Sequence, residues 1–398
     1  MAGAVPLAVQ GILDLATVLP VEEVVDLGPA DGIAVSEDVR STRKERIRRF
    51  PIVADRAYEA TLRAHLERYE RYHVGRIGLM SIPECRAAGA HLVVVKDGAY
   101  VRESSRGGQS FRDRSLFPRD EQDSILFEES RPSTRIDGSA LVVGAKAADG
   151  YFHWMTEIVP RLVAGRRDDR ARAMPVVMRP TGHEYQRETL RWLGVEPTVV
   201  ETPIVEIERA IVPTFPIHLK RGGRYSGELV ELVREFAGTV APRHEGETPR
   251  RLYVSRRDAR HRHVANEDEV EAALTREGFA CVTLTGTPVP EQIRMFEQAE
   301  VVVAQHGAGL TNLLFARPGT RVVELYPRGF IAPSPFWMLA SLAGLDYSMM
   351  VCDVVPDSVI PGRGHNNADI VVDVRALLRS VPGPRRRGWR IGRRPARG

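Results

Sequence analysis

A glycine-bearing turn between two apolar runs constrains the fold of this 398-residue chain more than any other feature. Residues 301–304 (VVVA) form an unbroken apolar run, which is typical of a strand buried on both faces of a parallel sheet. The turn 305–309 (QHGAG) follows, and the pattern then predicts a short helix over 310–316 and a second strand over 321–325. This order predicts an α/β fold in which backbone N–H groups at a helix N-terminus face an anion.

The residues of the turn suit an anionic ligand. Gly307 and Gly309 permit positive φ angles and let a ligand approach the backbone, while His306 supplies a cation beside it. Glycine turns also occur in α/β proteins that bind nothing there, so the interpretation depends on the neighbouring side chains. We predict ligand contacts, through side chains or backbone N–H groups, from His306, Gly307, Ala308, Gly309, Thr311 and Asn312.

A carboxylate lies at the end of the second predicted strand. In dinucleotide-binding folds an acidic residue about twenty positions after the glycine turn accepts hydrogen bonds from ribose hydroxyls. Glu324 has a comparable spacing from the turn. We therefore predict that Glu324 binds the ribose of a nucleotide, although this pattern does not name a reaction.

Length and composition predict a soluble protein of two or three domains, since an ordinary domain has roughly 150 residues. Hydrophobic residues make up 43% and charged residues 27% of the chain, as in globular proteins. The net charge of +4 reflects a tail, because residues 384–398 contain seven arginines and no acid. Three widely spaced cysteines, an N-terminus without a basic n-region and the lack of a long apolar window favour a cytoplasmic protein.

Alternating strand and helix patterns divide the chain into parts. The polar stretch 239–248 contains proline and glycine and predicts a linker between two α/β domains. The predicted parts are an N-terminal region of unclear structure (1–90), a first α/β domain (91–240), a second α/β domain (249–380) and a basic disordered tail (381–398). Two such domains create a cleft, and clefts between domains are common ligand sites.

A predicted helix over 151–162 carries the candidate catalytic residues. Helical spacing puts His153, Glu157 and Arg161 on one stripe, and Pro160 should kink the helix. His153 and Glu157 are both candidates for a general base. A surface ion pair between Glu157 and Arg161, and a packed or hydrogen-bonding role for His153, are the structural alternatives.

The second domain offers a further cation at the end of its first predicted strand, 251–256. Parallel-sheet geometry places Arg256 at the same edge as the His306 turn, where a guanidinium can bind an oxyanion with two hydrogen bonds. An exposed charge in the basic loop is the alternative for Arg256. His261 and His263 have arginine neighbours, so an anion-facing or solvated loop is favoured over a metal site.

In the order of its motifs the chain resembles glycosyltransferase family 61. The motifs are the HWxxEIVPRL helix (153–162), the YVSR strand (253–256) and the HGAGLTN turn (306–312) with the VVEL strand after it, and the resemblance covers roughly residues 140–330. It implies a GT-B-like fold of two Rossmann-like domains facing each other across a cleft. It also implies an inverting transfer from a nucleotide sugar that is bound mainly by the C-terminal domain. Many family members have asparagine where this chain has Gly150.

The chemistry of the residues agrees with that implication. Sugar transfer needs a stabilised diphosphate leaving group and a deprotonated acceptor hydroxyl, and this chain has no Asp-x-Asp motif for a divalent metal. We therefore expect Arg256, His306 and the backbone N–H groups of 307–309 to neutralise the leaving group without a metal or other cofactor. His153 or Glu157 would act as the general base.

The leading hypothesis is an inverting, metal-independent transferase that uses a nucleoside-diphosphate sugar, with UDP as the expected nucleotide, in capsular or surface polysaccharide synthesis. Its partners would be the donor and a glycan or lipid-linked acceptor. A nucleotide-sugar epimerase on the same fold is one alternative, and a nucleic-acid-binding protein acting through the arginine tail is another. The tail could instead hold the enzyme at anionic lipids on the inner face of the membrane.

Overall fold

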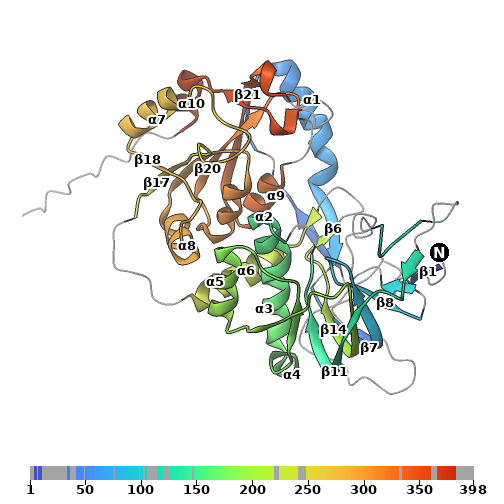
Figure 1. Ribbon diagram of the computed structural model, residues 1–398. Coiled ribbons are helices and arrows are strands. Elements are labelled where there is room, and N and C mark those ends of the chain that lie inside the picture. The colour runs from blue at the N-terminus through green and yellow to red at the C-terminus, as the bar shows by residue number, and fades with distance from the viewer. Residues whose placement is uncertain are drawn as a thin grey trace, which may run out of the picture.

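The computed structural model describes residues 4–6, 8–10, 34–35 and 42–381, the last range with gaps at 49, 76, 98, 102–103, 105–113, 120–125, 146–147, 219–223, 241–247, 331–333 and 360–364. Most of the predicted linker 239–248 and nearly all of the predicted tail 381–398 lie outside the described residues. The described part is a mixed α/β structure. It has two large sheets with a group of helices between them (Figure 1).

The glycine turn belongs to the sheet of the second half of the chain. The strand order is β18 (Ala280–Val282), β17 (Arg251–Val254), β19 (Val301–Gln305), β20 (Arg321–Pro327), β21 (Asp346–Val354) and β22 (Ile370–Val371). These strands run parallel except for β22, which pairs with β21 in the antiparallel sense. The alternation of strands and helices that the sequence predicted is confirmed here, with β21 as an additional strand.

Strand β19 shows why an unbroken apolar run forms at this place. All five of its residues are buried. Successive side chains of a strand point to opposite faces, so Val302 and Ala304 contact one core and Val301 and Val303 another. The first core contains α8 (Val289–Gln298) and α9 (Pro335–Leu342), and the second contains α7 (Glu267–Arg276) and α10 (Val374–Ser380).

The sheet of the first half is only partly parallel. Its order is β13 (Pro197–Val199), β12 (Val176–Met178), β11 (Ser133–Val142), β14 (Ile204–Pro213), β7 (Leu79–Ala88), β8 (Val93–Lys96), β9 (Ala99–Val101) and β2 (Ala8–Gln10). The strands from β13 to β14 are parallel, whereas β14, β7, β8 and β9 pair in the antiparallel sense. Short connections join β7, β8 and β9, and a short connection cannot cross over to a parallel neighbour. Only the parallel part of this sheet, from β13 to β14, is therefore Rossmann-like.

The helices between the two sheets bring the two halves of the chain together. Helix α6 (Gly227–Thr239) packs against α3 (Val159–Arg167) of the first half and against α9 of the second. Arg234 of α6 donates hydrogen bonds to the carbonyl oxygens of Leu314 and Ala316. One hydrophobic core includes residues from both halves. Among the described helices, none is long and apolar enough to cross a bilayer.

The helix predicted over 151–162 has an irregular middle. It consists of α2 (Tyr151–His153), a π-helical turn over Trp154–Ile158 and then α3. The wide turn comes directly before Pro160, which has no N–H to donate and whose ring collides with the preceding turn of a regular helix. The predicted distortion is therefore present, and it takes the form of a π turn that includes Glu157.

The N-terminal region, which could not be read from the sequence, contributes to both sheets. Strand β5 (Ile52–Val53) pairs with β21 in the second sheet, whereas β7 is a central strand of the first. Helix α1 (Arg56–Leu66) lies beside the second half, where the Tyr58 hydroxyl accepts a hydrogen bond from the Gly329 N–H (Figure 1). Residues 42–88 therefore connect the two halves a second time.

Candidate functional site

Arg256 and the His306 turn leave the second sheet at the same edge. Strands β17 and β19 are parallel neighbours in register, with Val254 opposite Ala304. The residues that follow each strand therefore emerge side by side at the carboxyl ends, where open α/β sheets bind ligands. The structure brings together the two groups that the sequence predicted for this edge.

The guanidinium of Arg256 lies directly across Gly307. A Cβ atom added to Gly307 would be 2.1 Å from Arg256 Nη1. Arg256 Nη2 also donates a hydrogen bond to the carbonyl oxygen of His261 at 3.2 Å. Burial, with the positive charge of Arg262 nearby, lowers the pKa of Arg256 to about 10, so the side chain remains charged at neutral pH. An anion bound here would compensate a cation that has lost much of its water.

The turn glycines act through close contact and not through positive φ angles, which corrects the expectation from the sequence. Gly307 has φ 172° and ψ 171°, which is extended backbone open to any residue. The φ angle of Gly309 is likewise not positive. A Cβ at Gly309 would approach Leu284 and Val254 to 3.2 Å. Glycine at these positions provides space, and at Gly307 that space holds Arg256.

We expect Gly307→Ala to weaken binding of an anion at Arg256 about tenfold with little loss of stability. The added methyl group must displace the Arg256 guanidinium, which is the far end of a flexible side chain. A tenfold change corresponds to about 1.4 kcal/mol of binding free energy. Calorimetric titration with UDP and thermal unfolding would measure the two effects. Gly238→Ala is the control, because a Cβ at Gly238 meets nothing within 4 Å; unchanged affinity in Gly307→Ala would contradict the role given to this contact.

His306 is held by a buried carboxylate. Its Nδ1 lies 2.5 Å from Glu324 Oε1, and Glu324 is fully buried. The other carboxylate oxygen of Glu324 accepts hydrogen bonds from the hydroxyls of Ser334, at 2.8 Å, and Tyr347. Burial and the Glu324 charge raise the pKa of Tyr347 well above its usual value, so Tyr347 remains a hydrogen-bond donor. Glu324 therefore fixes the orientation of the His306 imidazole through Nδ1.

The ribose-binding role predicted for Glu324 is therefore wrong. Both of its oxygens are engaged inside the protein, and no part of the side chain reaches the surface. The spacing from the glycine turn was similar to that of a dinucleotide fold, but spacing does not determine which way a side chain faces. Glu324 orients His306 instead, as a carboxylate orients a catalytic histidine in other enzymes.

Thr311 and Asn312 also differ from expectation, because both side chains are fully buried. They belong to η7 (Ala308–Phe315), a 3₁₀ helix whose residues from Leu310 onward are buried. Asn312 Oδ1 accepts a hydrogen bond from the Tyr151 hydroxyl at 2.5 Å, and its amide nitrogen donates to Gln292 Oε1 at 2.8 Å. The prediction that the side chains of Thr311 and Asn312 contact a ligand is therefore wrong. Asn312 instead links the two halves of the chain.

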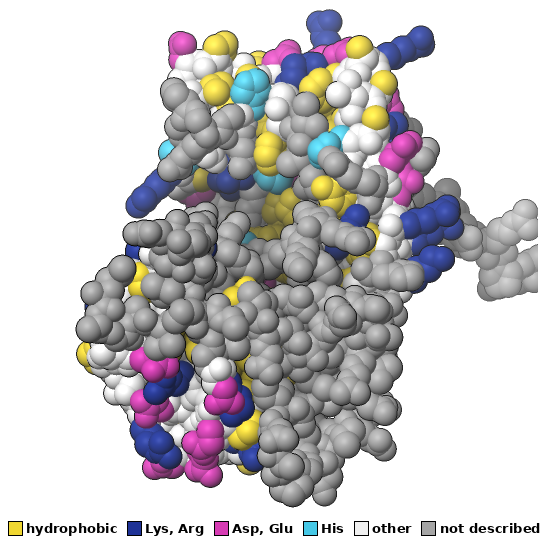
Figure 2. All heavy atoms as spheres, turned by 90° about the vertical axis from the view of Figure 1, so that its right-hand side faces the viewer, with side chains coloured by type: hydrophobic (Ala, Val, Ile, Leu, Met, Phe, Trp, Pro, Cys, Tyr) yellow, Lys and Arg dark blue, Asp and Glu magenta, His cyan; other side chains and the backbone are white. Residues whose placement is uncertain are grey.

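A pocket of about 410 Å³ opens beside the turn and is shared by both halves. The first half supplies Tyr151 and residues at the start of α5 (Glu184–Leu193). The second half supplies Arg256, the loop 284–288, Ala308 and Gly309. Figure 2, which faces the right-hand side of Figure 1, shows that the surface is also hollowed there between the upper and lower parts of the molecule, with hydrophobic and histidine side chains inside. A concave pocket at the carboxyl ends of parallel strands is typical of a small-molecule site.

His153 and Glu157 form a second histidine–carboxylate pair, in the first half. His153 Nδ1 lies 2.6 Å from Glu157 Oε1, and the side chain of His153 is 29% exposed while that of Glu157 is fully buried. The ring of Phe152 contacts Phe336, whose ring in turn contacts His306. The two pairs therefore come from different halves and approach each other across the interface, with His153 as the more accessible member of its pair.

The alternative of a surface pair between Glu157 and Arg161 is excluded by burial. Arg161 is 1% exposed and donates hydrogen bonds to the carbonyl oxygens of Pro213 and Gly144, with its guanidinium over the Phe215 ring. Burial lowers the pKa of Arg161 to about 9, although the nearby Glu157 charge opposes this shift. Arg161 thus ties α3 to the first sheet and provides positive charge behind Glu157.

Sequence reasoning did not identify Arg262. Arg262 Nη1 donates a hydrogen bond to the His306 carbonyl oxygen at 3.1 Å. Burial lowers the pKa of Arg262, and its own φ of 65° is unusual for a residue other than glycine. The loop 256–263 contains many basic residues, and no local signal distinguishes those that fold inward. His263 bonds with Ala259 and Asp369 instead, and in the described ranges no group of three or more His, Cys, Asp or Glu side chains is arranged to hold a metal.

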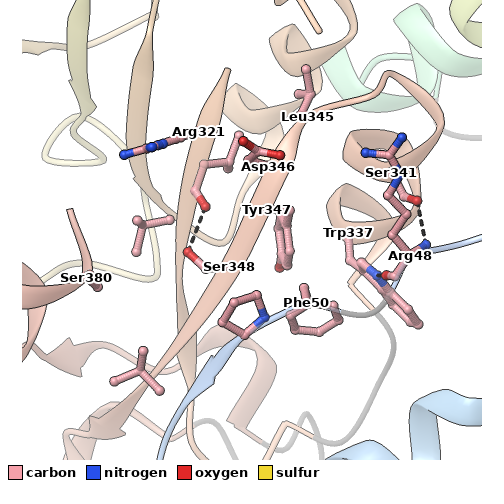
Figure 3. A pocket seen from close by; sticks show the side chains of 14 residues that line it. Arg48, Phe50, Arg321, Trp337, Ser341, Leu345, Asp346, Tyr347, Ser348 and Ser380 are labelled. Atoms are coloured by element: carbon pink, nitrogen blue, oxygen red, sulfur yellow. Dashed lines mark hydrogen bonds between the residues drawn. The ribbon is translucent and has the colours of Figure 1, made fainter. Parts of the chain in front are cut away.

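A second hollow of about 470 Å³ lies at the opposite end of the same sheet (Figure 3). Arg321 and Asp346, at the starts of β20 and β21, line it together with Phe50 and Trp337. Ligands of open α/β sheets bind at the carboxyl ends of the strands, whereas this hollow is at the amino ends. The pocket beside Arg256 is therefore the candidate active site.

Comparison with known proteins gives a family for this site. Residues 151–323 match the family model Glycosyltransferase 61. Over 122 residues the chain is 35% identical to a beta-1,2-xylosyltransferase of Oryza sativa subsp. japonica, covering 30% of this chain and 20% of that protein. It is 33% identical over 125 residues to a beta-1,2-xylosyltransferase of Arabidopsis thaliana, covering 30% and 23%.

A third relative is named for the transfer of a different sugar. The chain is 37% identical over 89 residues to protein O-linked-mannose beta-1,4-N-acetylglucosaminyltransferase 2 of Takifugu rubripes, covering 21% of this chain and 15% of that protein. The chain thus spans about a fifth of the length of the curated relatives it matches.

The matched region contains the His153 helix, the Arg256 loop and the glycine turn, so the class that these residues define is that of the glycosyltransferases. Within that class, residues 151–323 match the glycosyltransferase 61 family and are similar to its xylosyltransferases. The resemblance seen in the sequence motifs is confirmed.

Proposed function

We propose that this protein is an inverting, metal-independent glycosyltransferase that takes its sugar from a nucleoside-diphosphate sugar, with UDP as the nucleotide. The observation that carries the proposal is the pocket shared by the two halves, with the Arg256 guanidinium across Gly307 on one wall. We also propose that the two halves act as the facing domains of a GT-B-like enzyme, with the donor on residues 249–380 and the acceptor on residues 91–240.

Arg256 and the turn bind the donor diphosphate in this proposal. The guanidinium of Arg256 and the Nε2–H of His306 donate to the phosphate oxygens, and backbone N–H groups at Gly307, Ala308 and Gly309 add further donors. Arg262 supports this arrangement, because it holds the His306 carbonyl and adds positive charge next to Arg256. These cations perform the charge neutralisation for which other transferases use a divalent metal.

His153 acts as the general base. Glu157 holds Nδ1–H of His153, so Nε2 carries the lone pair that accepts the proton of the acceptor hydroxyl. The acceptor oxygen attacks the anomeric carbon, the bond from that carbon to the diphosphate oxygen breaks, and the diphosphate leaves with the electron pair. One displacement inverts the configuration at the anomeric carbon. The Glu157 carboxylate stabilises the imidazolium that forms.

The proposed biological setting is supported by the family resemblance and by the basic composition of the C-terminal stretch. We propose a role in capsular or surface polysaccharide synthesis, with a glycan or lipid-linked acceptor, in the cytoplasm at the inner face of the membrane. The basic stretch 384–398 would contact anionic lipids. Co-sedimentation with phosphatidylserine vesicles should require this stretch, and equal binding of a chain lacking residues 384–398 would contradict the lipid contact.

A donor screen tests the main proposal. Thermal unfolding is measured with UDP, other nucleoside diphosphates and their sugars, with and without EDTA. We expect UDP and a UDP-sugar to raise Tm equally in both conditions, since ligand binding to the folded state stabilises it. Product analysis with and without a glycan acceptor then separates transfer from epimerisation. The absence of any nucleotide effect, or an effect abolished by EDTA, would overturn the proposal as stated.

A further inference from the structure

The inference concerns Tyr151, a residue to which sequence reasoning gave no role. Tyr151 is the first residue of α2, and its side chain lines the pocket beside Arg256. Its hydroxyl donates a hydrogen bond of 2.5 Å to Asn312 Oδ1 in η7, which belongs to the other half of the chain. The helix that carries His153 is thus tied by its first residue to the helix that follows the glycine turn.

The hydrogen bonds continue from Asn312 to the opposite wall of the pocket. The amide nitrogen of Asn312 donates to Gln292 Oε1 at 2.8 Å, and Gln292 Nε2 donates to the carbonyl oxygen of Thr287 at 2.8 Å. Thr287 belongs to the loop 284–288 that lines the pocket. Tyr151, Asn312 and Gln292 therefore connect two walls of the pocket through buried polar groups, and such networks hold a single geometry when every member is satisfied.

The phenol of Tyr151 keeps its proton. Burial raises the pKa of Tyr151 above its ordinary value, and the nearby Tyr185 adds to this effect. The hydroxyl is therefore a donor throughout the working pH range, and its proton is committed to Asn312. Tyr151 is suited to fixing a position and not to accepting a proton from the acceptor.

The candidate base lies close to this link. His153 is two residues after Tyr151 in α2, and Phe152 between them contacts Phe336 of the second half. The π turn that contains Glu157 begins directly after His153. Any rotation of α2 against η7 would move the imidazole relative to the donor, and the contact between Tyr151 and Asn312 opposes that rotation.

We propose that Tyr151 is a positioning residue, which sets the place of His153 relative to the bound donor through its hydrogen bond to Asn312. This inference rests on the proposed function and adds to it the element that joins donor site and base. Asn312 has the same positioning role. Catalytic geometry is sensitive to such supports, since a displacement of about 1 Å can cost about 10²-fold in rate.

The test is Tyr151→Phe, which removes the hydroxyl and keeps the ring in the pocket. We expect kcat to fall about 10- to 100-fold, while the dissociation constant for UDP changes less than about threefold. The acid limb of the pH profile of kcat should move, because the surroundings of His153 change. Asn312→Ala should give a similar loss, and the double variant should lose little more than either single variant.

Tyr72→Phe is the matched control. It removes a buried tyrosine hydroxyl that donates to the Tyr225 carbonyl oxygen at 2.8 Å, outside the site. Wild-type kcat and pH profile in this variant, at a comparable loss of Tm, would separate positioning from stability. Unchanged kcat in Tyr151→Phe, or equal losses of kcat and UDP affinity, would overturn the inference, whereas a wild type that binds no nucleotide would overturn the proposed function itself.

Discussion

Replacing His153 with alanine is expected to lower kcat about 10²–10⁴-fold, which is the usual contribution of a positioned general base. His153 is the more exposed residue of its pair with Glu157, and it belongs to the half that faces the glycine turn. The affinity for UDP should remain within about threefold of wild type, because the diphosphate site lies in the other half. Initial rates at saturating donor, combined with calorimetric titration, measure both quantities.

Glu157→Gln distinguishes the base from the group that orients it. If His153 is the base, the glutamine keeps a hydrogen-bonding atom near Nδ1 and loses only the charge, so its kcat should fall less than that of His153→Ala. A loss in Glu157→Gln that equals or exceeds the loss in His153→Ala would assign the base to Glu157 instead.

Replacing Arg256 with alanine is expected to abolish stabilisation by UDP. The guanidinium lies over Gly307 at the wall of the pocket, and burial has already removed part of its water. Each hydrogen bond from it to a phosphate is worth about 1.5–3 kcal/mol, or about 10- to 100-fold in affinity. Loss of two such bonds places the dissociation constant beyond the range of a thermal-shift measurement. The loss should be the same with and without EDTA.

Arg257→Ala is the control for Arg256. Arg257 is the next residue and is exposed, with hydrogen bonds to Asp268 and Glu271. Surface pairs of this kind contribute little to stability. UDP affinity should therefore remain at the wild-type level. Equal losses in the two variants would indicate general attraction by the basic loop and would contradict a specific site at Arg256.

The sequence was sufficient for features that depend on local pattern. Residues 184–193, followed by Gly194, have the pattern of a helix with a glycine stop, and α5 has these bounds, with Gly194 in the left-handed conformation. The approach of Arg256 to the His306 turn was predicted because parallel neighbours in register bring their carboxyl ends to one edge. Apolar periodicity and turn residues carry this information within a few positions of each element.

The errors concern the direction in which polar side chains face. Glu324 and Asn312 lie on elements that were correctly located, yet both point into the protein. A carboxylate on a strand is compatible with a ligand or with a buried histidine, and the partners of Glu324 come from as far along the chain as Tyr347. A local sequence pattern does not indicate a hydrogen-bond partner that is distant in sequence.

What the sequence by itself determined is the order of strands and helices in the second half, the place of the glycine turn and the similarity of residues 151–323 to the glycosyltransferase 61 family. Only the tertiary structure decided that Glu324 supports His306, that Gly307 makes room for Arg256, and that Tyr151 bonds to Asn312, 161 positions away. The physical reason is that secondary structure follows from neighbouring residues. The geometry of a site follows from packing between distant segments, and the sequence of neither segment alone indicates that contact.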